Sequence, residues 1–249
     1  MHRLGYLPDK PDDRDHGFAA TTLLEMPERA SLRRYVVEVL DQGALSSCVA
    51  NAVAQAIRVG QAKRSHGEVP PLLSRLFVYY NSRAYHGAYD FDGGTYLRTA
   101  IKSVAKFGFC PESSWEYRGP WKKRPPWSAY RDSIDQRKIV GYYRIGSEGE
   151  VRMHDVKLAI ASGYAVTFGT DVSMAFVAGD APGDGVWRKP AGEPIAGGHA
   201  MAAVEYDERG VAGPNSWGEG WGDKGWFCIG WDYIAWDRTR DLWVIDVAA

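Results

Sequence analysis

Cysteine is scarce in this chain. Three cysteines occur among 249 residues, at positions 48, 110 and 228, and none forms a Cys-x-x-Cys pair. So few and so widely spaced cysteines exclude a disulfide framework, and the lack of a tight histidine and cysteine cluster argues against zinc. We therefore predict neither disulfides nor a metal site.

Long apolar runs are missing as well. No segment approaches the ~20 apolar residues that cross a bilayer, and the N-terminus lacks the apolar run of a secretory signal. The formal net charge is −1, which gives no reason to expect nucleic acid or an anionic membrane as a partner. A reducing interior is the expected location, and export by a route that reads no such signal stays open.

Near residue 135 the sequence pattern changes from one typical of helices to one typical of strands, which predicts an α+β fold with segregated lobes. Apolar spacing predicts helices at 48–65, 72–85 and 96–107, then a short one at 151–162, and strands at 36–40, 139–145, 164–169, 186–187, 199–206, 226–229 and 242–247. A glycine-rich run at 192–198 is expected to separate two of these strands. The helical lobe covers about 44–135 and the β-rich lobe about 136–249. Residues 1–25 are polar and turn-rich, and form an N-terminal extension to a domain at 26–249.

Cys48 lies at the start of the first predicted helix. Ser46 and Ser47 are residue types that cap helices, and a helix dipole lowers the pKa of a thiol in its first turn. Gln42, six residues earlier, is placed to turn its amide toward an anion beside the sulfur. A lone cysteine in an alanine-rich helix is more often a small buried hydrophobe. A nucleophilic role therefore requires a histidine base and a group that orients it.

The second half of the chain supplies both partners. His199 begins an apolar stretch directly after Gly197 and Gly198, and Asn215 follows sixteen residues later. An asparagine at the end of the next strand can accept a hydrogen bond from the imidazole and fix its tautomer. Trp217 is placed to shield that bond from water.

These motifs, in this order, resemble those of the papain-like cysteine peptidases. The matching segments are Gln42-Gly43 with Cys48 and Ala50, Asp92-Gly93-Gly94, Gly198-His199-Ala200, Asn215-Ser216-Trp217-Gly218, Gly225-Trp226-Phe227 and Met26-Pro27-Glu28. The resemblance covers roughly residues 26–247 and implies a two-lobed fold, a helical lobe and an antiparallel β-barrel-like lobe with the active-site cleft between them. Leu45 and Val49 replace the cysteine and tryptophan that are usual in the family, so the chain resembles a compact bacterial-type member without disulfides.

The resemblance implies an endopeptidase that works through a thioester acyl-enzyme and needs no metal or organic cofactor. It assigns Cys48 as nucleophile, His199 as base, paired at rest as thiolate and imidazolium, and Asn215 as the residue that orients the base, with the Gln42 side chain and the Cys48 N–H as oxyanion donors. Substrate-binding roles fall to Gly93, Gly94, Tyr96, Phe168, Gly197 and Trp217. A peptide or protein is the expected substrate, and a protein inhibitor could occupy the same groove.

Three further expectations concern the groove. Tyr96, Phe168 and Gly197 are expected to form an apolar pocket without nearby charge for the second side chain upstream of the cut. Residues 1–25 either cover part of the groove as a tethered competitor or form a disordered or merely docked tail. Two other functions remain open: an inert papain-like protein that binds peptides, and acyl transfer or amide hydrolysis on a non-peptide substrate.

Overall fold

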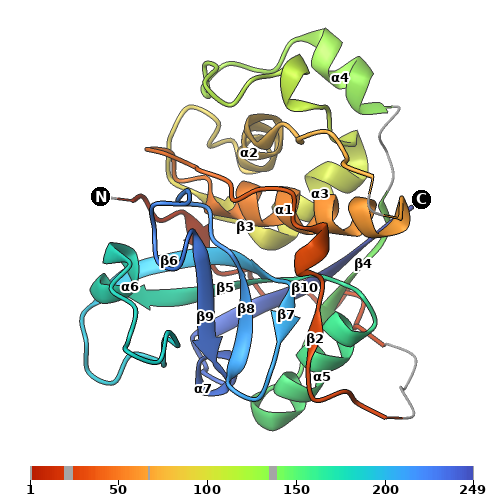
Figure 1. Cartoon of the computed structure of the whole chain (residues 1–249). Helices are drawn as coiled ribbons and strands as arrows, with labels where there is room; N and C mark the ends of the chain where they lie inside the picture. The colour runs from red at the N-terminus through yellow and green to blue at the C-terminus, as the bar shows by residue number, and fades with distance from the viewer. Residues whose placement is uncertain (1, 20–24, 67, 135–138, 249) are drawn as a thin grey trace.

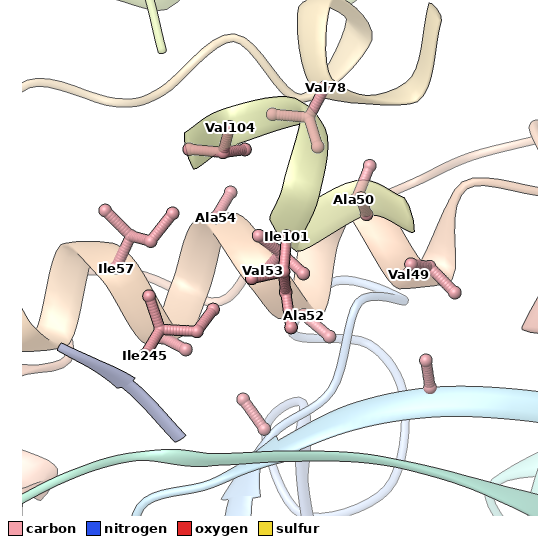
Figure 2. Close-up of a cluster of buried hydrophobic side chains, with 14 of the residues drawn as sticks. Val49, Ala50, Ala52, Val53, Ala54, Ile57, Val78, Ile101, Val104 and Ile245 are labelled. Carbon is pink, nitrogen blue, oxygen red and sulfur yellow. The ribbon is translucent and has the colours of Figure 1, made fainter. Parts of the chain in front are cut away.

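Helix α1 (Cys48–Arg64) lies at the centre of the computed structural model, which describes residues 2–19, 25–66, 68–134 and 139–248 (Figure 1). Its many alanines let neighbours approach closely on two sides. Val78 and Ile101 pack on it from the helical lobe, whereas Ile245 contacts it from the β-rich lobe (Figure 2). The two lobes therefore share one buried helix, and Cys48 is the first residue of that helix.

The helical lobe contains α2 (Arg75–Ala84), α3 (Leu97–Phe107) and α4 (Trp127–Ile134), with short 3-10 turns η1 (Arg33–Tyr35) and η2 (Glu112–Ser114). Helix α2 begins three residues later than predicted, because the Ser74 hydroxyl accepts the Phe77 N–H and caps it there. The predicted strand at 36–40 is wrong, since these residues have no strand partner. Helix α4 was not predicted.

The β-rich lobe consists of two four-stranded sheets, neither closed into a barrel within the described residues. In the first sheet the strands lie in the order β4 (Ile139–Ile145), β10 (Thr239–Val247), β5 (Val166–Ser173) and β6 (Ile195–Ala203). In the second sheet the order is β2 (Ala30–Ser31), β7 (Glu205–Tyr206), β8 (Gly210–Pro214) and β9 (Trp226–Gly230). Helices α5 (Gly149–Ala161), α6 (Met174–Ala178) and α7 (Trp231–Ile234) complete the lobe. The glycine-rich run at 192–198, predicted to separate two strands, is partly wrong, because β6 already starts at Ile195.

The segregation of helices and antiparallel sheets confirms the predicted α+β class. Within the described ranges, no helix combines the length and the apolar character needed to span a bilayer.

Residues 2–18 run across both lobes and are called the arm. Strand β1 (Tyr6–Leu7) pairs in parallel with β3 (Thr95–Tyr96). Further along, the Asp9 carboxylate accepts the backbone N–H of Arg98 in the first turn of α3. Asp15 then pairs with Arg98 of α3 and with Arg144 of β4. The arm thus joins the helical lobe to the β-rich lobe by charge as well as by backbone pairing.

Asp15→Ala is expected to lower the free energy of unfolding by about 1.5–3 kcal/mol, because it removes the charged hydrogen bonds that the buried Arg98 guanidinium donates to Asp15. Urea unfolding measures this change. Asp13→Ala is the matched control, since Asp13 is exposed in the same segment and should change stability by no more than about 0.5 kcal/mol. Equal stability losses in the two variants would contradict a bridging role for Asp15.

Candidate active site

Cys48 is the first residue of α1 and is fully buried. The predicted serine cap is wrong: Ser47 occupies the N-cap position without a side-chain cap hydrogen bond. Its hydroxyl instead pairs with the Tyr117 hydroxyl and accepts from the Asn51 amide. The Cys48 sulfur faces the backbone N–H of Ala200, the residue after His199 on β6. Strand β6 therefore brings the predicted base alongside the start of α1.

His199 and Asn215 meet as predicted. The His199 Nε2–H donates to the Asn215 Oδ1 over 2.8 Å, and the Ser216 backbone N–H donates to the same oxygen over 2.8 Å. This second bond fixes the amide with its oxygen toward the ring. Nδ1 of His199 is then the atom left to accept a proton. Trp217 stacks on the imidazole with ring centroids 4.2 Å apart, so it covers the bond as expected.

The Gln42 side chain is also fixed. Its Oε1 accepts the Ser216 hydroxyl over 2.7 Å, which turns Nε2 away from Ser216 and toward the arm. Nε2 donates to the backbone carbonyl of Arg3 over 2.9 Å and to that of Leu45 over 2.7 Å. A peptide carbonyl thus lies on the amide that the sequence assigns to the oxyanion.

The arm passes directly over these groups. Its Gly5 N–H faces the Cys48 sulfur, and its Gly5 carbonyl accepts the Thr95 N–H over 2.9 Å. A Cβ on Gly5 would lie 2.0 Å from the Ser46 carbonyl oxygen, and one on Gly94 would lie 2.1 Å from the Gly5 oxygen. Only glycine fits at both positions, and the backbone of Gly94 lies directly against the backbone of the arm. A Cβ on Gly93 would instead meet the Phe91 ring.

The side chains that flank Gly5 occupy the remaining predicted contacts. His2 stacks on the Trp217 indole at 4.8 Å between centroids. Leu4 lies against Gly197, where a Cβ would come within 2.9 Å of its Cδ1. Tyr96 pairs with Leu7 through β1 and β3. Together these contacts place the arm along the predicted substrate positions.

The expected apolar pocket differs in two respects. Phe168 is buried in the β-rich lobe, edge-on to Phe227, because alternate residues of a strand face opposite sides. The neighbouring Gly169 faces the cleft instead, and the Tyr6 ring lies against it. The pocket also contains charge: the Tyr6 hydroxyl donates to Asp241 over 2.6 Å. Asp241 belongs to β10, 235 residues from Tyr6 in the chain, and no local motif marks it.

Burial under the arm favours the neutral forms of Cys48 and His199. Burial raises the pKa of the Cys48 thiol to about 11, against the smaller opposing effect of the Ala200 and Gly5 N–H groups. Burial likewise lowers the pKa of His199 to about 4, although the Asn215 hydrogen bond acts in the opposite direction. Burial beneath the arm thus favours the thiol of Cys48 and the neutral imidazole of His199, whereas the resemblance implies a thiolate and an imidazolium at rest.

The remaining cysteines lie outside this site. Cys48, Cys110 and Cys228 are all described, and each is a free thiol. This agrees with the prediction that the protein contains no disulfide. Burial raises the pKa of both Cys110 and Cys228, as it does for Cys48, but among the described residues neither lies near a histidine and asparagine pair like that of His199 and Asn215.

The Cys48 thiolate is expected to be nearly absent from the full-length protein at neutral pH. Because its pKa lies at about 11, raising the pH should produce thiolate only in the alkaline range. The ultraviolet absorbance of the thiolate measures this, with Cys48→Ala as the blank. One equivalent of Cys48 thiolate at about pH 7 would contradict the account of the covered site.

Comparison with known proteins places the chain in a family. The model of the papain family of cysteine proteases matches residues 26–234. An uncharacterized peptidase C1-like protein, L477, of Acanthamoeba polyphaga mimivirus is 34% identical over 245 residues, which covers 88% of this chain and 78% of that protein. Xylellain, a cysteine protease from Xylella fastidiosa, has a crystal structure that matches with a TM-score of 0.86 at 30% identity, covering 99% of this chain and 96% of that one.

A more distant structure shares the fold. The Carica candamarcensis cysteine protease CMS1MS2, solved in complex with E-64, matches with a TM-score of 0.68 at 21% identity, over 90% of this chain and 100% of that one. The family model and the two relatives at or above 30% identity agree with the motifs found in the sequence. The chain belongs to the papain family of cysteine proteases.

Proposed function

We propose that this cysteine protease is an endopeptidase in which Cys48 attacks a peptide carbonyl and forms a thioester. His199 takes the thiol proton at Nδ1, gives it to the leaving amine and then activates water. Asn215 orients the imidazole throughout. The Gln42 amide and the Cys48 N–H stabilise the oxyanion, and one such donor is worth ~3 kcal/mol.

One observation carries this proposal: the Gln42 amide, oriented by Ser216, donates to the backbone carbonyl of Arg3, in the arm whose Gly5 N–H faces the Cys48 sulfur. A site that already binds one peptide carbonyl at the predicted oxyanion donor is suited to bind another as a substrate. One alternative is an inert protein that only binds peptides. Such a protein would not need the arrangement seen at His199, in which Nε2 is hydrogen-bonded to Asn215 and Nδ1 is left to accept a proton.

Cys48→Ala and His199→Ala are each expected to reduce kcat for peptide hydrolysis by about three orders of magnitude or more, because the residues act as a unit. The double variant should lose little beyond either single variant. Fluorogenic peptides measure the rates, and melting temperatures verify that each variant folds. More than about a tenth of wild-type activity in a folded single variant would refute the assignment.

We further propose that the arm inhibits the enzyme from within the cleft. A substrate places the attacked carbonyl at Gln42 and extends from there, toward its own N-terminus, past Gly94 and Tyr96. The arm has its Arg3 carbonyl at Gln42 but extends past Gly94 toward its C-terminus. Because its direction is opposite to that of a substrate, the arm occupies the cleft without offering its own bond for cleavage. Its withdrawal would rehydrate Cys48 and His199 and so lower the thiol pKa and raise the imidazole pKa.

Gly5→Ala is expected to weaken this inhibition, because the added methyl group collides with the Ser46 carbonyl. Overpacking of this kind costs about 1–3 kcal/mol, so the apparent KM should fall by about tenfold while kcat stays the same. Gly17→Ala is the control, since nothing lies within 4 Å of a Cβ at that arm position. An unchanged KM in a folded Gly5→Ala variant would show that the arm does not gate the cleft.

A further inference from the structure

Asp92 presents one carboxylate oxygen to the cleft. Its Oδ1 accepts the Tyr79 hydroxyl over 2.5 Å and the Ser46 backbone N–H over 3.0 Å. Its Oδ2 faces Arg3 of the arm, whose Nη1 lies 3.2 Å away. The Asp92 side chain is only 11% exposed. Among the described residues, Arg3 is the one basic side chain that forms an ion pair with it.

The loop that carries Asp92 is held from behind by a buried arginine. Arg83 of α2 is 1% exposed and donates to the backbone carbonyls of Tyr89, Phe91 and Trp121. Its guanidinium also stacks on the Tyr79 ring, 4.0 Å from the centroid. Arg83 holds the loop through these carbonyls; among the described residues it forms no ion pair with Asp92, although the two charges lie close enough to attract each other. The carboxylate is therefore fixed in place before any ligand arrives.

Arg3 connects this carboxylate to the predicted oxyanion donor. Its carbonyl accepts from Gln42, and its guanidinium pairs with Asp92. One residue thus reaches both groups, although the arm runs opposite to a substrate. When the arm withdraws, Oδ2 of Asp92 loses its partner and a largely buried negative charge faces the cleft. Such a charge is stabilised by a basic side chain and not by a neutral one.

We propose that Asp92 is a specificity-determining residue that selects arginine or lysine immediately upstream of the cleaved bond. This inference rests on the proposed peptidase function and specifies its substrate class. Asp92 lies at the required place, because it binds the N–H of Ser46, two residues before Cys48, and directly precedes Gly93 and Gly94. The arm imitates this recognition with Arg3, which adds a charged contact to its occupation of the cleft.

The test compares two fluorogenic peptides that differ only in having arginine or its neutral isostere citrulline before the cut. We measure kcat/KM for both with the full-length wild type, with Asp92→Asn and with Asp90→Asn. Asparagine keeps an oxygen for Tyr79 and Ser46 but removes the charge. Asp90 is an exposed carboxylate of the same loop and serves as the control. The ratio of the two rates cancels any effect of the arm, since both peptides meet the same enzyme.

The wild type and Asp90→Asn should prefer arginine over citrulline by about tenfold or more, as expected for a hydrogen bond to a charged group. The preference should fall to about twofold or less in Asp92→Asn. Cys48-dependent cleavage of both peptides at equal rates by the wild type would overturn the role of Asp92 and leave the peptidase function intact. An undiminished preference in Asp92→Asn would do the same. Cleavage of neither peptide, by the wild type or by Gly5→Ala, would overturn the peptidase function and the inference together.

Discussion

The segment Asn215-Ser216 orients the reactive groups of both lobes. The Asn215 oxygen holds His199, whereas the Ser216 hydroxyl holds the Gln42 amide. Two backbone bonds reinforce the arrangement: the Ser216 N–H donates to the Asn215 side chain, and the Gln42 N–H donates to the Ser216 carbonyl. An error in the placement of this one segment would misdirect the proposed base and the proposed oxyanion donor at once. The site therefore depends on how β8 ends, since Asn215 directly follows Pro214.

The path of the arm over Cys48 also depends on close packing between backbone segments. The arm can pass Cys48 because Gly5 has no side chain to meet Ser46, and because Gly94 has none to meet Gly5. These contacts exclude water from the thiol and the imidazole, which explains why burial is the largest influence on the pKa of both. In this account, inhibition has two components: the arm occupies the position of a substrate, and it suppresses the charged form of the nucleophile. Farther along the arm, Asp15 adds charged contacts to Arg98 and Arg144.

Sequence motifs predicted the groups that meet in the site but not the groups that surround them. Cys48, His199, Asn215 and Gln42 lie in local patterns that are visible in the chain, so they could be proposed as one group without coordinates. Asp241 reaches the cleft only through the pairing of β10, which no short pattern encodes. Asp92 belongs to the Asp92-Gly93-Gly94 motif, but its pairing with Arg3 and the support of its loop by Arg83 could not be read from that motif. Phe168 was assigned to the wrong face because a shift of one residue on a strand exchanges core and cleft. Similarly, the strand predicted at 36–40 had a suitable composition but finds no partner in the folded chain.

Covalent labelling tests the central claim most directly. The full-length protein is incubated with a peptidyl epoxide, and the modified residue is located by peptide mapping under conditions that also report Cys110 and Cys228. The account predicts a single adduct on Cys48, which forms more slowly in the wild type than in Gly5→Ala and is absent from a folded His199→Ala variant over the same time. An adduct on either other cysteine in place of Cys48, or labelling of Cys48 that proceeds equally without His199, would contradict it.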